Sequence, residues 1–118
     1  MSTHEFGIMD SFEENKWYSA YEPQKYNCIS VNDVIIEDLI IRFDKELRAI
    51  KTYHIVSTQV GKGLDYTGVT IIPPESLNQF RDVLSKANSR YQSPELQALL
   101  EMLTEAIKLG KHLIHYGI

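Results

Sequence analysis

The side chains best suited to metal binding or acid–base chemistry are three of the four histidines, His54, His112 and His115, and the single cysteine, Cys28. His112 and His115 lie three residues apart, and a helix would place them side by side on its surface. Two ligands are too few for zinc, because a structural site takes four protein ligands and a catalytic site takes three. We therefore expect no metal site and no cofactor. We interpret these two histidines as cations near a helix C-terminus, where the helix dipole favours positive charge.

Cys28 and His54 would form a nucleophile–base pair if their strands brought them together. However, neither a Cys-x-x-Cys motif nor a directly following helix start is present to lower the pKa of the Cys28 thiol. We therefore interpret Cys28 as a small hydrophobe, and we assign no catalytic residue. The alternative is a small-ligand or enzyme site in a pocket between sheet and helices, lined by Cys28, Tyr53, His54 and Tyr66.

Two further motifs are interpreted as ordinary surface features. The stretch VGKGL (60–64) has no following helix to present backbone amides to a phosphate, so it predicts a hairpin turn. Two pairs of carboxylates are adjacent in the sequence, Glu13–Glu14 and Glu37–Asp38. On a helix the two members of a pair would point in different directions, so we interpret both pairs as solvated faces.

The N-terminal segment 1–26 combines aromatic and acidic side chains. It contains half of the twelve aromatic residues, and its five carboxylates and two lysines give it a net charge of −3 out of −4. Aromatic rings are enriched at binding hot spots, and carboxylates steer basic partners. We therefore predict a surface for a basic protein partner, formed by Trp17, Tyr18, Tyr21, Glu13, Glu14 and Glu22. The alternative is that these rings pack onto the protein's own sheet and complete its core.

The elements that would position these residues follow from local patterns. Asp10 or Ser11 would cap a short helix that Pro23 ends. Residues 27–72 are rich in strand signals. We expect strands at 26–31, 50–58 and 65–72, the last two paired antiparallel, and a helix at about 35–48 whose cap is Asn32–Asp33. The alternative for 35–48 is a hairpin that returns from Asn32–Asp33.

Residues 73–118 have the spacing and start signals of helices. Pro73–Pro74 starts one helix that ends near Asn88–Ser89, and Ser93 caps the last helix. We expect this helix to continue through Gly110 to about His115; the alternative is that it ends near Gly110 and that a strand follows. Its broad apolar stripe would allow a homo-oligomer to form through this C-terminal helix.

Together these patterns predict one α+β domain, 1–118, with a small antiparallel sheet of about three strands packed against two or three helices. The net charge of −4 disfavours nucleic acid as a partner. One cysteine cannot form an intrachain disulfide. The sequence starts without a signal-peptide pattern, and no apolar stretch approaches the ~20 residues of a membrane helix. We therefore expect a cytoplasmic protein without a membrane partner.

One part of the sequence resembles known bacterial proteins. The stretch KTYHIVSTQVGKGLDYTGVTIIPPESLNQFRDVL, about a third of the chain, looks like small stand-alone bacterial proteins. Its passage from GVTII through PPESL to a helix is similar to segments of immunity proteins from polymorphic toxin systems. The resemblance implies an acidic protein that binds and neutralises a toxin domain, and it carries no functional residue. Our hypothesis is a non-enzymatic, protein-binding domain.

Overall fold

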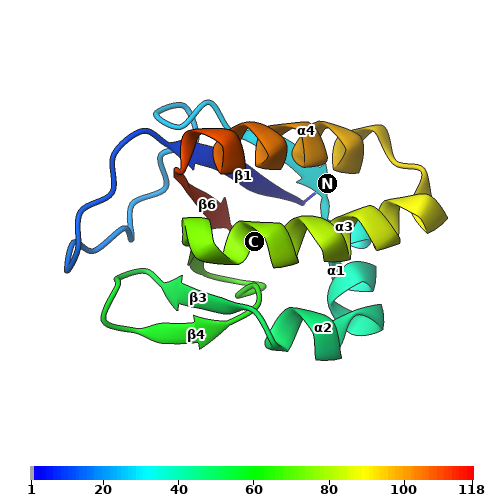
Figure 1. Cartoon of the computed structure of the whole chain (residues 1–118), viewed down its shortest axis with the longest axis horizontal. Coiled ribbons are helices and arrows are strands. Elements are labelled where there is room, and N and C mark those ends of the chain that lie inside the picture. The colour runs from blue at the N-terminus through cyan, green and yellow to red at the C-terminus, as the bar shows by residue number, and fades with distance from the viewer. Residues whose placement is uncertain (1) are drawn as a thin grey trace.

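A six-stranded antiparallel sheet separates a layer of helices from a long N-terminal segment in the computed structural model, which describes residues 2–118 (Figure 1). In chain order the elements are β1 (Thr3–Met9), β2 (Ile29–Asn32), α1 (Asp33–Arg42), α2 (Asp44–Arg48), β3 (Lys51–His54), β4 (Val60–Lys62), β5 (Val69–Ile72), the short 3-10 helix η1 (Pro74–Ser76), α3 (Leu77–Tyr91), α4 (Pro94–Leu109) and β6 (His112–Tyr116). The strand order is β2-β1-β6-β5-β3-β4, and every neighbouring pair is antiparallel.

The main core lies between the sheet and the helices. α3 and α4 pack against each other and cover one sheet face, with α1 beside them (Figure 1). Side chains alternate between the two faces of a strand, so Phe6 of β1, Ile72 of β5 and Leu113 of β6 all point into this layer. They are fully buried there, which makes apolar burial the main contribution to the stability of this layer.

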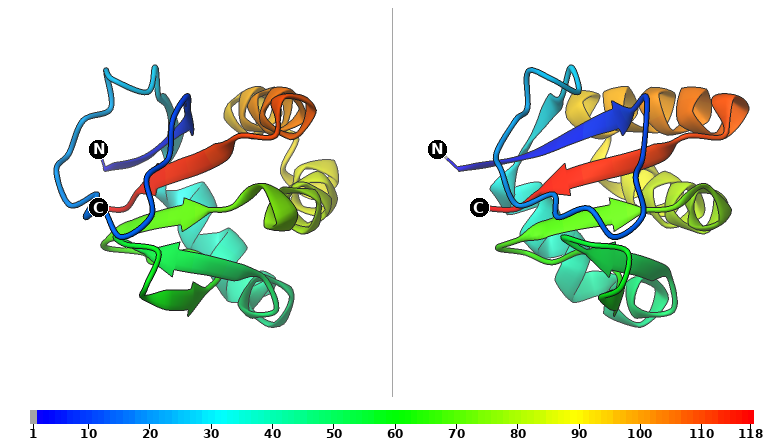
Figure 2. Two further views of the ribbon diagram at one scale, coloured as in Figure 1. Left: turned by 60° about the vertical axis from the view of Figure 1, so that its left-hand side comes forward. Right: turned by 90° about the vertical axis from the view of Figure 1, so that its left-hand side faces the viewer.

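The opposite sheet face is covered by the chain's own residues 10–28 (Figure 2). Tyr18 and Tyr26 of this segment pack with Met9, Ile71 and Ile114 in a second, smaller core. Gly7 of β1 makes the close approach feasible, since a Cβ there would lie 2.7 Å from the Cβ of Tyr26. The alternative interpretation of the N-terminal aromatics, as rings that complete the core, therefore holds for these two tyrosines.

Three sequence predictions are wrong: the number of strands, a helix in the N-terminal segment, and the length of the last helix. The sheet has six strands rather than about three, because β1 was not expected, β4 lies inside the expected hairpin turn, and β6 was only the alternative to a longer last helix. Residues 10–28 contain turns but no helix, so the helix capped by Asp10 or Ser11 does not form. The last helix does not continue to His115. It ends at Gly110, whose φ of +65° favours glycine, and β6 follows as the alternative predicted.

Other predictions are confirmed. The class is α+β, and β3 and β5 pair antiparallel. Asn32 and Ser93 cap their helices: the Asn32 Oδ1 atom accepts a hydrogen bond from the Val34 amide at 2.8 Å, and the Ser93 Oγ atom accepts one from the Leu96 amide at 3.2 Å. The helix expected at 35–48 is present as two helices, α1 and α2, that meet at Phe43.

Most of the apolar stripe of α4 is used inside the chain. Its buried residues are Leu96, Leu99, Leu103 and Ala106, while Leu109 at its end is 49% exposed. Association through this helix stays a prediction. None of the helices in residues 2–118 is long and apolar enough to cross a membrane.

The fit of residues 10–28 over β1 can be tested by replacing Gly7 with alanine. The added Cβ would lie 2.7 Å from Tyr26 Cβ and 2.8 Å from Cys28 Sγ, so we expect Gly7→Ala to lower the free energy of unfolding by about 1–3 kcal/mol. Ser11→Ala, at an exposed position of the same segment, serves as the control. Urea denaturation measures both variants, and equal stability of Gly7→Ala and the native chain would contradict this packing.

Candidate functional site

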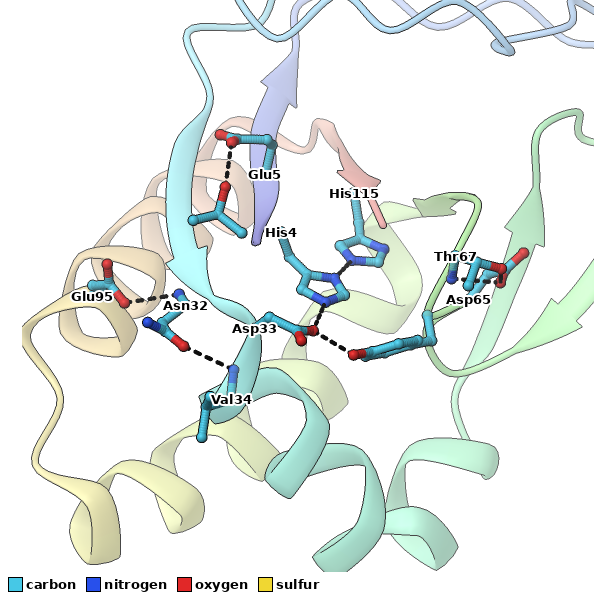
Figure 3. A network of polar contacts seen from close by, with 11 residues as sticks. His4, Glu5, Asn32, Asp33, Val34, Asp65, Thr67, Glu95 and His115 are labelled. Carbon is cyan, nitrogen blue, oxygen red and sulfur yellow. Dashed lines mark hydrogen bonds and ion pairs between the residues drawn. The ribbon is translucent and has the colours of Figure 1, made fainter. Parts of the chain in front are cut away.

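A chain of hydrogen-bonded polar side chains runs through the buried end of the sheet, where α1 begins (Figure 3). Thr70 of β5 and Phe6 of β1 both pair with His115 of β6. His4 lies two residues before Phe6 and therefore shares its face of β1. The register thus places His4, His115 and Thr70 together beneath the helical layer, although 111 residues separate the two histidines.

Five side chains form this network, and each contacts the next in the order Tyr66, Asp33, His4, His115 and Thr70. The His4 Nδ1 and His115 Nε2 atoms are 2.8 Å apart. His4 Nε2 lies 2.9 Å from Asp33 Oδ1, and the Tyr66 hydroxyl donates to the same oxygen at 2.6 Å. At the other end, His115 Nδ1 lies 3.4 Å from Thr70 Oγ1. The network therefore joins β1, β6 and β5 to the start of α1 and to the loop before β5.

The carboxylate of Asp33 fixes the direction of these hydrogen bonds, because an ionised carboxylate only accepts. His4 must donate from Nε2. With a neutral His4, Nδ1 accepts from His115 Nε2, and His115 Nδ1 accepts from the Thr70 hydroxyl. With a protonated His4, Nδ1 donates to His115 instead, and His115 Nδ1 donates to Thr70. Both arrangements use all four imidazole nitrogens, so neither leaves a buried nitrogen unpaired.

Burial and hydrogen bonding shift the pKa values within the network. The Tyr66 hydroxyl, followed by His4, holds the pKa of the Asp33 carboxyl below its usual range. The hydrogen bond to Asp33 raises the pKa of Tyr66 to about 12. Complete burial, with a smaller contribution from neighbouring His4, lowers the pKa of His115 to about 3. His115 is therefore neutral at physiological pH, and Asp33 carries a negative charge at the N-terminus of α1, where the helix dipole favours it.

A carboxylate–imidazole pair is the arrangement that orients a general base in many enzymes. A base must also reach the proton that it removes. His4 and His115 are both 0% exposed, and neither lines any of five hollows on the surface of residues 2–118. The geometry therefore fits a positioning role, in which the network holds α1 and Tyr66 against the sheet.

The other candidate chemical groups are not brought together. Cys28 lies just before β2 and His54 lies on β3, with three strands between, which separates them by roughly 19 Å. Burial, aided by Glu5, raises the pKa of the Cys28 thiol to about 12, so the thiol stays protonated. Of the proposed pocket lining Cys28, Tyr53, His54 and Tyr66, only Tyr66 takes part in the buried network. The nucleophile–base pair, which the sequence left only as an alternative, therefore does not form.

The interpretation of His112 and His115 as helix-end cations is wrong, because both lie on β6. Residues three apart on a strand point to opposite faces. The His112 ring stacks on Phe12 with ring centroids 4.0 Å apart, and burial lowers its pKa. Within residues 2–118, no three His, Cys, Asp or Glu side chains are grouped so that they could hold a metal ion.

The predicted partner-binding residues divide into exposed and buried groups. Trp17 and Tyr21 are 60% and 65% exposed, and Glu13, Glu14 and Glu22 are exposed as well. Tyr18 is only 7% exposed, so its ring belongs to the second core rather than to an outer surface. The outer surface of this segment therefore has two large rings.

Backbone and side-chain contacts fix the segment that carries these rings. The Tyr18 amide donates to the Ile55 carbonyl at 2.9 Å, and the Tyr18 hydroxyl accepts from the Glu13 amide at 2.9 Å. Tyr21 packs edge-on against Tyr116, with ring centroids 5.1 Å apart. Beside Tyr21 lies a hollow of about 270 Å³, which includes Ile55 and Tyr116 in its lining. The backbone next to Trp17 and the ring of Tyr21 are therefore held in place before any partner binds.

The charges of this segment are partly balanced by lysines. Glu13 pairs with Lys16 at 3.3 Å, Glu22 with Lys25 at 3.5 Å, and Asp10 with Lys111 at 2.7 Å. Such exposed pairs are weak, so the carboxylates remain available to exchange a lysine for a partner's cation. Glu14 has no ion-pair partner among the described residues.

The burial of His115 predicts how stability depends on pH. Because its pKa is about 3 in the folded chain, against an ordinary value of 6.5, the unfolded chain binds this proton more readily. The stabilisation is complete above pH 6.5 and is lost as the pH falls towards 3. We expect His115→Gln, which offers an amide donor to His4, to reduce the pH slope by up to about 1.4 kcal/mol per pH unit. Chemical denaturation between pH 6.5 and about 4 measures the slope.

His112 stays in both proteins, so its own lowered pKa cancels in this comparison. Asp33, His4 and Tyr66 are the other titratable members of the network. The lowered pKa of Asp33 affects the stability only at pH values below the usual pKa range of an aspartate. Identical slopes for the two proteins would show that His115 is not buried in its neutral form.

A second prediction concerns the hydrogen bond between Tyr66 and Asp33. Since this bond is the largest cause of the raised pKa of Tyr66, Asp33→Asn should lower that pKa from about 12 towards its ordinary value of 10. Titration of the Tyr66 ring followed by carbon-13 NMR measures the change, and the Tyr91 ring, which bonds to Asp38 instead, is the internal control. An unchanged Tyr66 titration would disprove the contact.

No protein-family model, curated protein or solved structure matched this chain in comparisons of its sequence and its structure. What the protein does must therefore be inferred from the contacts, burial and charges described above.

Proposed function

We propose that the protein is a non-enzymatic binding domain that recognises a basic partner protein through the exposed rings of residues 10–28. The observation that carries this proposal is the exposure of Trp17 and Tyr21, at 60% and 65%, on a segment that is otherwise fastened to the sheet. Large apolar rings are normally buried in a domain of this size. Their exposure on a fixed segment is typical of a contact surface.

Fixing the segment favours binding because less conformational entropy is lost when the partner arrives. Tyr18 contributes from the inside, as the anchor that holds the backbone between the two exposed rings. Trp and Tyr supply a large contact area with few rotatable bonds, and such residues dominate binding energy in protein interfaces. Trp17 is therefore the residue whose loss should weaken binding most.

The carboxylates around these rings determine the kind of partner. Glu13, Glu14 and Glu22 are exposed, and the chain as a whole has a net charge of −4. Complementary potentials accelerate association and reject partners of like charge. A basic partner surface is the one that this charge pattern favours.

The passage from GVTII through PPESL to a helix is similar to segments of immunity proteins, and this resemblance implies a toxin domain as the class of partner. The mechanism would be occlusion: the two rings cover the basic surface with which the toxin binds its own substrate. In this arrangement the domain needs no chemistry of its own, since inhibition follows from the area covered.

The proposal can be tested with the proteins encoded next to the gene of this protein, each purified and titrated separately. Trp17 is the only tryptophan of the chain, so the chain's own tryptophan fluorescence, after subtraction of the partner's emission, reports on this surface alone. We expect a blue shift of its emission on binding, and a loss of affinity of about 2 kcal/mol, or about thirtyfold, in Trp17→Ala.

Leu109→Ala, an exposed apolar position at the end of α4, is the matched control and should bind as the native chain does. Glu14→Gln should mainly slow association, and more so at low salt than at moderate salt. If the folded Trp17→Ala variant binds every partner with native affinity, the proposed surface is wrong.

A further inference from the structure

The outward face of α1 has more apolar surface than a surface helix normally shows. Six of its ten residues are Val, Ile or Leu. Ile36 and Leu39 enter the main core, but Val34 and Ile41 are 70% and 67% exposed. A helix of a globular protein usually places polar residues on its outer side, so this face is available for a contact outside the chain.

A hollow of about 310 Å³ lies on this face, where α1 meets the loop before β5. It is lined by Glu37, Ile40, Ile41 and Tyr66. The lining thus combines two aliphatic side chains, one aromatic ring and one carboxylate. Aliphatic walls accept the methylene stem of a long side chain, whereas a ring and a carboxylate attract a cation.

The hollow has a carboxylate in its lining that is unpaired among the described residues. Within residues 2–118, Glu37 has no ion-pair partner, whereas the neighbouring Asp38 is bound by Arg42 at 2.9 Å. Asp33 lies directly behind the Tyr66 hydroxyl and is 19% exposed. The buried network therefore holds the Tyr66 ring in one position and adds a second negative charge close to it.

We propose that this hollow is a binding site for an arginine side chain of a partner protein. The stem of the arginine lies on Ile40 and Ile41, and its guanidinium group bonds to the Glu37 carboxylate and stacks on the Tyr66 ring. Arginine fits better than lysine because its planar group can do both at once. This site is separate from the exposed rings of residues 10–28, so it does not depend on the function proposed above.

A second copy of the chain is a poor occupant of this face. In a two-fold symmetric contact through α1, Val34 would meet Ile41 of the other copy and the reverse. Glu37 lies between these two positions in the helix and would then face Glu37 of the other copy. Like charges at the centre of an interface oppose association, which leaves a basic partner as the complementary one.

The site can be tested in the native chain by NMR with capped amino acids. The probe is N-acetyl-arginine methylamide, and the neutral control is N-acetyl-norleucine methylamide, which keeps an aliphatic stem but has no charge. For a single side chain we expect a dissociation constant on the order of millimolar. The arginine probe should shift the amide signals of Glu37, Ile40, Ile41 and Tyr66, and the norleucine probe should bind at least about fivefold more weakly.

Glu37→Lys should reduce binding of the arginine probe by more than about fivefold, because it replaces attraction by repulsion. Glu105→Lys makes the same change of charge at an exposed position of α4 and should leave binding unchanged. The fluorescence of Trp17 should not respond to the probe, which separates this site from residues 10–28. The proposal is overturned if the four amide signals do not move at about 50 mM probe, if norleucine binds equally well, or if Glu105→Lys weakens binding as much as Glu37→Lys.

Discussion

The hydrogen bonds from Asp33 through His4 to His115 hold the buried end of this fold together. Imidazoles that are completely buried destabilise a protein unless their nitrogens are paired. Here each nitrogen has a partner, and the partners come from β1, β5, β6 and α1. The pairing therefore determines where α1 starts relative to the middle of the sheet. Because Tyr66 bonds to the same Asp33 oxygen, it also determines how the loop before β5 lies against α1.

Both proposed contact surfaces depend on an internal anchor. On one side of the sheet, the buried ring of Tyr18 fixes the backbone that carries Trp17 and Tyr21. On the other, the buried histidines fix Asp33 and through it the ring of Tyr66. In each case a polar group of the anchor is hydrogen-bonded within the protein: the Tyr18 hydroxyl to the Glu13 amide, and the Asp33 carboxylate to His4. An aromatic ring and a carboxylate remain at the surface beside each anchor. Such preorganised surfaces lose little conformational entropy on binding. Both surfaces are negative, so one basic partner could use either of them.

The sequence predicted the elements that have strong local signals. The helix caps at Asn32 and Ser93 were recognised because a polar side chain at a helix start has a local effect. β1 was missed because Glu5 and Gly7 weaken its strand signal, although His4, Phe6 and Ile8 alternate with them. The position of β6 depended on Gly110, which favours the end of a helix, whereas the apolar spacing of Leu113 and Ile114 suggested that the helix continues. The left-handed backbone of that glycine decides the outcome.

The exposed rings of residues 10–28 were found from composition, but the histidine network was not. His4 and His115 are 111 residues apart and become neighbours only through the register of β1 and β6. The sequence around a single histidine does not indicate which distant residue will be its hydrogen-bond partner. The same holds for Asp33, which reads as a helix-start residue and becomes a hydrogen-bond acceptor for two side chains only after the sheet forms.

The hydrogen bond between the two histidines is the most direct test of this account. Nuclear magnetic resonance of the nitrogen-15-labelled protein can detect a scalar coupling between His4 Nδ1 and His115 Nε2 across that bond. We expect such a coupling, together with an imidazole proton on the bond that exchanges slowly with water. Absence of the coupling, with both imidazole protons exchanging as rapidly as those of an exposed histidine, would contradict the buried network and the position of Tyr66 that rests on it.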